Sequence, residues 1–190
     1  MIDYIGDLSR ADAAVLAALA SRAFRILEFG AGASTQIFSV YGAGVVHSVE
    51  TDPGWIAKTT RNLARFPHGR SVTFHDYDTF LPEPVGYDLV FVDGVDELRA
   101  AFAFCTWGFL DPRGVMAFHD TRRTVPHGLS LTSDVENVCE LLRRHPLEVD
   151  RVEWNRDDSN TTVVAKRRTP LVLEDWNAVE GRTLAQIGLE

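Results

Sequence analysis

The chain has 190 residues, with 19 lysines and arginines against 27 aspartates and glutamates, so its formal net charge is 19 − 27 = −8. Apolar residues make up 45% and charged residues 24% of it, which excludes a disordered or fibrous chain. The acidic balance disfavours a generic basic groove for nucleic acid. The longest apolar run, Ala13–Ala20, has eight residues, whereas a membrane-spanning helix needs about 20. We therefore expect one globular domain over residues 1–190, with no nucleic-acid or membrane partner.

Two local features favour a cytoplasmic protein. The start of the chain, Met1–Asp3, lacks the basic region of a signal peptide. The two cysteines, Cys105 and Cys139, both fall on apolar stripes of expected helices. We therefore expect buried thiols rather than a disulfide.

Helix and strand signals alternate through most of the chain. Ser9 is placed to cap a first helix, and Asp52 precedes a helix that begins at Pro53. Strands are predicted at 24–29, 45–50, 72–77, 87–92 and 115–118. The segment 111–114 (DPRG) is predicted to be a turn. This alternation is typical of a parallel sheet covered by helices.

The end of the chain departs from this pattern. Residues 149–154 and 161–165 read as strands on either side of a polar turn, 156–160, that is too short to hold a helix. They are therefore predicted to form an antiparallel hairpin. The tail, 168–190, has no clear apolar period, and a lid, a packing arm and a dimer contact all remain open for it.

A glycine-rich turn follows the first strand. In the segment Glu28–Thr35 (EFGAGAST), Gly30 and Gly32 would let a ligand approach the backbone closely. Glu50 ends the second strand, twenty residues after Gly30, where a carboxylate can accept both hydroxyls of a ribose. A dinucleotide motif would have a third glycine where Thr35 stands. A nucleoside site is expected, with NAD disfavoured; the alternative is a turn that only connects strand to helix.

Over residues 24–167, the chain resembles a class I S-adenosylmethionine (SAM)-dependent methyltransferase. Four segments support the resemblance: 26–32 (ILEFGAG) with the first motif, 49–50 (VE) with the ribose-binding acidic motif, 72–78 (VTFHDYD) with the segment that flanks the adenine, and 87–94 (YDLVFVDG) with the fourth-strand motif. It implies an α/β fold, a Rossmann-like three-layer sandwich. Its sheet would be mostly parallel and seven-stranded, with an antiparallel terminal hairpin.

The resemblance also implies SAM as the cofactor. Glu50 would hold the ribose, Tyr77 and Asp78 would border the adenine, and Asp93 would lie beside the transferable methyl group. The cofactor-binding residues implied in this way are Glu28, Gly30, Gly32, Ser34, Thr35, Glu50, Tyr77, Asp78 and Asp93.

A narrower resemblance involves the ends of the fourth and fifth strands. Val92–Gly94 (VDG) and Phe118–Thr121 (FHDT) are similar to the small-molecule O-methyltransferase branch, which includes the catechol type and the macrocin and novobiocin sugar-tailoring types. Many of its members have metal-binding carboxylates at these two strand ends. Asp93 and Asp120 are thus candidate Mg²⁺ ligands, although His119 stands where the sugar-tailoring pattern has the first of two adjacent aspartates.

Asp93 and Asp120 follow strands that this fold makes neighbours, about 4.8 Å apart. Two carboxylates that close need compensation: a bound cation, a raised pKa, or the charges of Arg122 and Arg123. The alternative is that both aspartates only cap a turn and a helix. His119, with an ordinary pKa near 6.5, is a candidate general base, and His127 is a second one.

The sequence thus predicts a SAM-dependent methyltransferase that acts on a small-molecule acceptor, with oxygen as the favoured atom. Asp93, His119 and Asp120 are the candidate catalytic residues. A homodimer through the tail is also considered. The alternatives are a SAM-binding module without catalysis and, less favoured, an NAD-dependent oxidoreductase on a Rossmann sheet.

Overall fold

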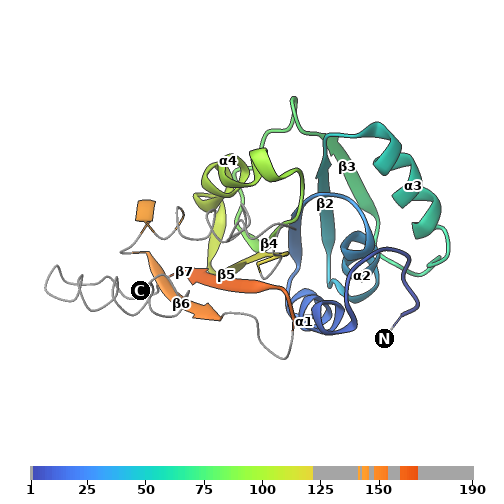
Figure 1. Cartoon of the computed structure of the whole chain (residues 1–190), viewed down its shortest axis with the longest axis horizontal. Helices are drawn as coiled ribbons and strands as arrows, with labels where there is room; N and C mark the ends of the chain where they lie inside the picture. The colour runs from blue at the N-terminus through green and yellow to red at the C-terminus, as the bar shows by residue number, and fades with distance from the viewer. Residues whose placement is uncertain (1, 122–140, 142, 146–147, 154–158, 167–190) are drawn as a thin grey trace, which may run out of the picture.

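A computed structural model describes residues 2–121, 141, 143–145, 148–153 and 159–166. The helices are α1 (Arg10–Ala20), α2 (Ala33–Tyr41), α3 (Pro53–Leu63) and α4 (Asp96–Trp107). The strands are β1 (Arg25–Phe29), β2 (Val45–Glu50), β3 (Val72–Asp76), β4 (Tyr87–Val92), β5 (Leu110–Phe118), β6 (Val149–Glu153) and β7 (Thr162–Lys166). They form one sheet in the order β3-β2-β1-β4-β5-β7-β6 (Figure 1).

The sheet is parallel except at β7. Strands β1 to β5 pair in parallel, whereas β7 lies between β5 and β6 and is antiparallel to both. The order and the antiparallel terminal hairpin agree with the predicted α/β sandwich. The tail, 168–190, and the turn residues 156–158 lie outside the described residues.

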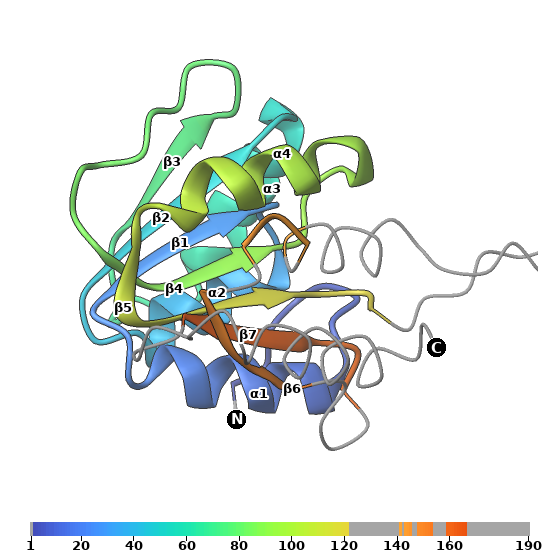
Figure 2. The same ribbon diagram turned by 90° about the vertical axis from the view of Figure 1, so that its left-hand side faces the viewer.

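Alternating strand residues supply two apolar layers. On one face, Ile26 packs with Leu16 of α1 and Ile37 of α2. On the other face, Leu27 belongs to the cluster that contains Phe102 of α4. Figure 2 shows α1 and α4 on these opposite faces. Strands buried on both sides explain the nearly continuous apolar runs in the sequence.

The predicted helix starts are confirmed. The hydroxyl of Ser9 accepts a hydrogen bond from the amide of Asp12 at 3.0 Å. The carboxylate of Asp52 accepts one from the amide of Gly54 at 2.7 Å, with Pro53 in the first turn. These caps satisfy amides that the helices leave unpaired.

Two local predictions are wrong. Residues 111–114 are not a separate turn but part of β5, and the pairing register shifts between Tyr87 and Leu89 to accommodate them. Cys105 of α4 was also expected on a buried apolar stripe. Arg99 and Trp107 face inward, and Cys105 is exposed; Cys139 lies outside the described residues.

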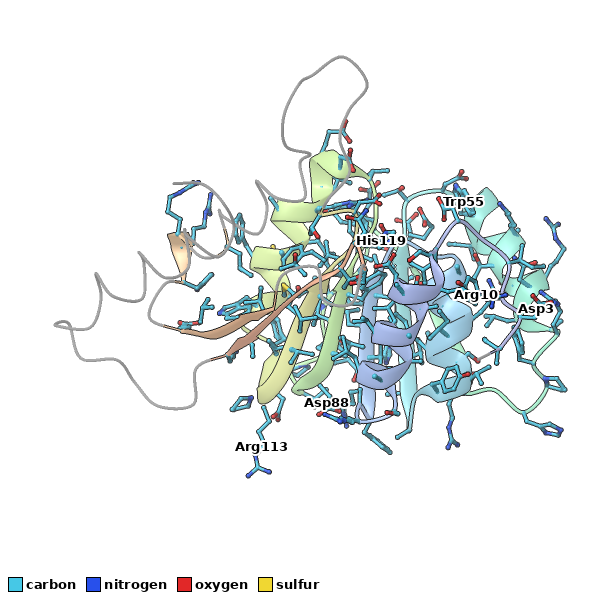
Figure 3. All side chains as sticks on the ribbon, turned by 60° about the horizontal axis from the view of Figure 1, so that its bottom comes forward. Asp3, Arg10, Trp55, Asp88, Arg113 and His119 are labelled. Carbon is cyan, nitrogen blue, oxygen red and sulfur yellow. The ribbon has the colours of Figure 1, made fainter. Side chains whose placement is uncertain are left out.

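The two ends of the parallel strands form opposite edges of the sheet, and these edges carry different side chains. Figure 3 shows His119 and Trp55 at one edge and Asp88 and Arg113 at the opposite one. The first is the edge at which the parallel strands end, where open α/β sheets bind ligands. Among the described helices, none is long and apolar enough to cross a membrane.

Candidate functional site

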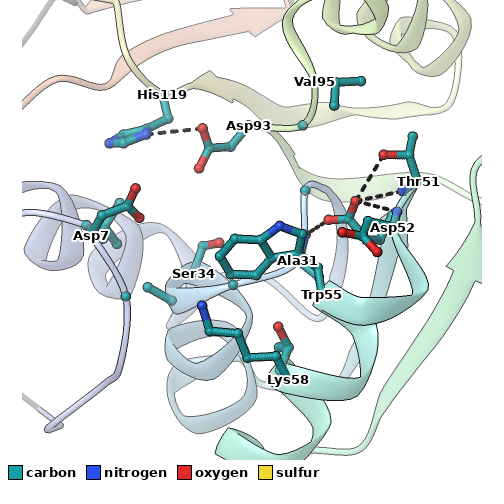
Figure 4. A pocket seen from close by; sticks show the side chains of 18 of the residues that line it. Asp7, Ala31, Ser34, Thr51, Asp52, Trp55, Lys58, Asp93, Val95 and His119 are labelled. Atoms are coloured by element: carbon teal, nitrogen blue, oxygen red, sulfur yellow. Dashed lines mark hydrogen bonds and ion pairs between the residues drawn. The ribbon is translucent and has the colours of Figure 1, made fainter.

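A cavity of about 800 Å³ opens at the carboxyl edge of the parallel strands. It is lined by the segment before α1, the glycine-rich turn, the end of β2, one side of α3, and the residues after β4 and β5. Every one of these segments follows or precedes an element of the sheet sandwich, so the fold itself assembles the cavity. Figure 4 shows its interior, with Asp93 and His119 opposite Trp55 and Lys58.

The glycine-rich turn forms one wall of this cavity. Gly30 has a φ of +98°, and a Cβ built on it would lie 2.5 Å from the carbonyl oxygen of Asp93. A side chain at this position would therefore meet both backbone strain and a clash. At Gly32, by contrast, a Cβ would meet nothing within 4 Å. The first glycine thus lets the turn pack against the end of β4, and the second leaves open space beside the turn.

A buried carboxylate supports this turn from below. Glu28, fully buried, accepts hydrogen bonds from the hydroxyls of Ser34 at 2.5 Å, Thr35 at 2.6 Å and Ser48 at 2.6 Å. Burial raises the pKa of Glu28 to about 7, and the three hydroxyl donors oppose that rise. Ser34 lines the cavity, but Glu28 and Thr35 do not. The structure therefore places these two residues where they can shape the turn rather than touch a ligand.

Glu50, the predicted ribose ligand, lines the cavity, and it also organises the backbone around it. Its Oε2 accepts a hydrogen bond from the amide of Ala31 at 2.8 Å. Its Oε1 accepts from the amides of Thr51 at 2.7 Å and Asp52 at 3.0 Å (Figure 4). Glu50 as a whole residue is 7% exposed. One group therefore joins the glycine-rich turn to the start of α3 while it faces the cavity.

The ends of β4 and β5 bring three predicted residues together. Nδ1 of His119 lies 3.2 Å from Oδ1 of Asp93 and 3.5 Å from Oδ1 of Asp120. Asp120 has a φ of +59°, which is uncommon outside glycine. This left-handed residue interrupts the alternation of a strand, so His119 and Asp120 both line the cavity. His127, Arg122 and Arg123 lie outside the described residues.

Two further residues complete this network, and neither was predicted from the sequence. Asp12 of α1, 2% exposed, lies with its Oδ2 3.5 Å from Nε2 of His119. Its Oδ1 accepts hydrogen bonds from the amide of Asn160 at 2.6 Å and the hydroxyl of Thr161 at 2.8 Å. Asn160 in turn donates from Nδ2 to Oδ1 of Asp120 at 3.1 Å. A polar residue in an otherwise apolar helix face was the only sequence signal for Asp12.

Arg99 is the second of these residues. It is 3% exposed, and its Nη2 lies 3.2 Å from Oδ1 of Asp93 and 3.4 Å from Oδ1 of Asp96. Its Nε donates to the carbonyl of Gly94 at 2.6 Å. A buried guanidinium requires such partners. The charge compensation that two neighbouring aspartates need is thus supplied by Arg99 together with His119.

The surroundings of His119 change its acid–base chemistry. Burial lowers its pKa, but the hydrogen bonds to Asp12 and Asp93 and the charges of Asp93 and Asp120 outweigh burial and raise it to about 10. The contact with His119 also changes the pKa of Asp12. Burial raises that pKa, but the hydrogen bonds from His119, Ser9 and Thr161 lower it to about 2. His119 is therefore an imidazolium at neutral pH, which opposes the predicted role of a general base with a pKa near 6.5.

The residues at this edge do not fit the predicted Mg²⁺ ion. Asp93, His119 and Asp120 can each offer one atom, and these atoms lie within 4.8 Å of one another. However, Mg²⁺ prefers an all-oxygen shell, and one of the three donors is an imidazole nitrogen. In addition, Oδ1 of Asp93 already faces two cationic groups, those of Arg99 and His119. The site has the charge pattern of an internal ion-pair network.

Two apolar side chains also line the cavity. Trp55 and Val95 line it and are each 44% exposed, and Nζ of Lys58 lies 3.8 Å from the centre of the Trp55 ring. Tyr77 and Asp78 do not line the cavity. The ring of Tyr77 packs instead 5.1 Å from that of Phe29. Their predicted contact with an adenine remains a prediction, whereas Trp55 is an aromatic surface that the sequence analysis missed.

Comparisons with known proteins identify the fold. No family model and no curated protein sequence matches the chain, but many solved structures do. A Podospora anserina methyltransferase bound to S-adenosylhomocysteine (SAH) has 17% identity over 84% of this chain and 79% of that chain, with a TM-score of 0.66. A Bacillus cereus O-methyltransferase in complex with SAH has 19% identity over 84% and 82%, with a TM-score of 0.63.

A third similar structure is the O-methyltransferase of tomaymycin synthesis from Streptomyces achromogenes, in complex with SAM. It has 19% identity over 85% of this chain and 83% of that chain, with a TM-score of 0.63. The chain has the fold of SAM-dependent methyltransferases. The sequence identity to these three proteins is 17–19%, so the comparison identifies the fold.

Proposed function

We propose that the chain transfers a methyl group from SAM to an oxygen atom of a small-molecule acceptor. The observation that supports this best is that one cavity joins the glycine-rich turn, the Glu50 carboxylate and the acidic ends of β4 and β5. A ribose hydroxyl acceptor and a charged edge that can receive a sulfonium are both needed for SAM. The solved O-methyltransferases with the same fold support the proposal further.

Different residues of the cavity bind different parts of the cofactor. Glu50 accepts the ribose hydroxyls, since its carboxylate faces the cavity at the end of β2. The open space at Gly32 receives the methionine end. Trp55 and Val95 offer apolar surface to the adenine, and Asp93 lies beside the sulfonium. Base–aromatic stacking contributes about 1–3 kcal/mol per base in other proteins.

Methyl transfer itself needs mainly alignment, because the sulfonium carries its own leaving group. The C–S bond breaks as the C–O bond forms, and SAH leaves. The proton of the acceptor hydroxyl goes to the carboxylate of Asp120, which lines the cavity. The imidazolium of His119, 3.5 Å from Oδ1 of Asp120, already carries its proton, which leaves the Asp120 carboxylate as the acceptor.

The size of the cavity supports a small acceptor. A volume of about 800 Å³ lies within the range of roughly 300–1,000 Å³ that small-molecule pockets of proteins occupy. We also propose a cytoplasmic location and a homodimer through residues 168–190. Light scattering on the full chain and on a chain that ends at residue 167 tests the dimer.

The direct test is methyl transfer from methyl-labelled SAM to a panel of catechols, phenols and sugar hydroxyls. The proposal predicts label in at least one acceptor and equimolar SAH. Asp120→Asn should lower turnover while leaving SAM affinity near that of the unmodified chain. Tight SAM binding with no transfer to any acceptor would favour the SAM-binding module without catalysis, and tight NAD binding would favour the oxidoreductase.

A further inference from the structure

A buried positive charge, the guanidinium of Arg99, lies at the carboxyl end of β4. The side chain of Arg99 is almost fully buried beside Asp93, and its three guanidinium nitrogens reach different partners. Nη2 contacts Oδ1 of Asp93 at 3.2 Å, Nε donates to the carbonyl of Gly94 at 2.6 Å, and Nη1 lies 3.5 Å from the carbonyl oxygen of His119. Arg99 therefore spans the ends of β4 and β5, where the two candidate metal-ligating aspartates lie.

A divalent cation at this edge would have to compete with Arg99. Its position would be between Asp93 and Asp120, whose ligand atoms lie within 4.8 Å of each other. A guanidinium stays charged at any pH at which the protein is folded. At separations of a few ångströms, the repulsion between it and a divalent ion is large in a partly buried site. The position of Arg99 should therefore lower the affinity of the site between Asp93 and Asp120 for a divalent metal ion.

We infer that Arg99 is the built-in counterion of Asp93 and that it excludes divalent metal ions from the site between Asp93 and Asp120. Arg99 is a positioning residue in this arrangement. It holds the Asp93 carboxylate in place through Oδ1 and compensates its charge, which is the role that a metal ion would have at such an edge. The inference concerns metal binding by the folded chain, so it does not depend on the proposed methyl transfer.

The test is a titration of the full chain with Mn²⁺, followed by electron paramagnetic resonance, without SAM or acceptor. The unmodified protein should show no saturable Mn²⁺ site, because the guanidinium of Arg99 already pairs with the carboxylate of Asp93. Arg99→Met, which removes the charge and keeps an apolar stem, should bind Mn²⁺ at least about tenfold more tightly. Adding Asp93→Asn to that variant should abolish the gained site.

Two controls separate the role of Arg99 from general effects. Arg113→Met removes an exposed arginine and should leave Mn²⁺ binding unchanged, which accounts for the change in net charge. Arg99→Lys keeps a positive charge and should bind Mn²⁺ as weakly as the unmodified protein. Circular dichroism of each variant establishes that it is folded.

Two results would overturn the inference. The first is a stoichiometric Mn²⁺ site in the unmodified protein that disappears in Asp93→Asn, a measurement that does not require the Arg99 variant to fold. The second is a folded Arg99→Met chain with unchanged Mn²⁺ affinity. Neither result bears on methyl transfer, because the titration contains no SAM.

Discussion

The carboxylate of Asp12, at the start of the first helix, lies 3.5 Å from the imidazole of His119, at the end of the fifth strand. Both side chains are buried. This pair connects the helix layer to the edge of the sheet that lines the cavity. Because Asp12 also accepts hydrogen bonds from Asn160 and Thr161, it joins three distant parts of the chain at one carboxylate.

Removing this charge should destabilise the fold. Asp12→Asn leaves the His119 imidazolium without one of its carboxylate partners, and breaking a buried ion pair on one side costs about 3–5 kcal/mol in other proteins. We expect a loss of that size in the free energy of unfolding, measured by denaturant titration. Asp3→Asn, at a side chain that is 96% exposed, should leave the stability nearly unchanged. A loss in Asp12→Asn no greater than in this control would contradict the structural role of the pair.

The protonation of His119 can be measured directly. Its pKa is raised to about 10, so the folded state binds its proton more tightly than the unfolded state does. The resulting stabilisation is complete below the ordinary pKa near 6.5 and is lost as the pH rises towards about 10. Imidazole nitrogen chemical shifts should show a charged ring at neutral pH, and Asp12→Asn should lower the midpoint. A midpoint near 6.5 in the unmodified chain would instead restore His119 as a general base.

The raised pKa of Glu28 leads to a second prediction, that the stability of the fold also changes in a lower pH range. Burial raises its pKa from the ordinary 4.5 to about 7, so the folded state favours the protonated acid. Its contribution to stability is complete below about 4.5 and falls as the pH rises to about 7. The stability difference between the unmodified chain and Glu28→Gln should therefore shift across this window in favour of the variant. Glu83→Gln, at a side chain that is 51% exposed, should show no such shift.

The position of the adenine can be decided by a pair of variants. Trp55→Ala should weaken SAH binding about tenfold, because one base–aromatic contact contributes about 1–3 kcal/mol. Asp78→Ala should leave the affinity unchanged, because Asp78 lies outside the cavity lining. The opposite pattern, with loss at Asp78 and none at Trp55, would place the adenine where the sequence predicts it.

The sequence predicted well what depends on local patterns. Caps at Ser9 and Asp52 and the buried strands follow from neighbouring residues, and so does the position of Glu50 at the end of β2. It failed where a contact is made across the sheet. Nothing near Asp12 indicates that it meets His119, a residue at the far end of β5.

The same limit explains the error in α4. Apolar spacing predicted its buried face, but Arg99 turns inward because Asp93 and the carbonyl of Gly94 lie there. A charged residue on an inward face is excluded by any rule that reads only hydrophobicity. The positive φ of Asp120, which lets two consecutive side chains face the cavity, was likewise invisible in the sequence.

Isothermal titration calorimetry with SAH measures directly whether the cavity binds the cofactor through Glu50. We expect one SAH bound per chain, no detectable NAD binding, and at least about tenfold weaker SAH binding in Glu50→Ala, because hydrogen bonds to a charged acceptor contribute about 1.5–3 kcal/mol. Absence of SAH binding to the folded, unmodified chain would contradict it, and so would SAH affinity that is unchanged in Glu50→Ala.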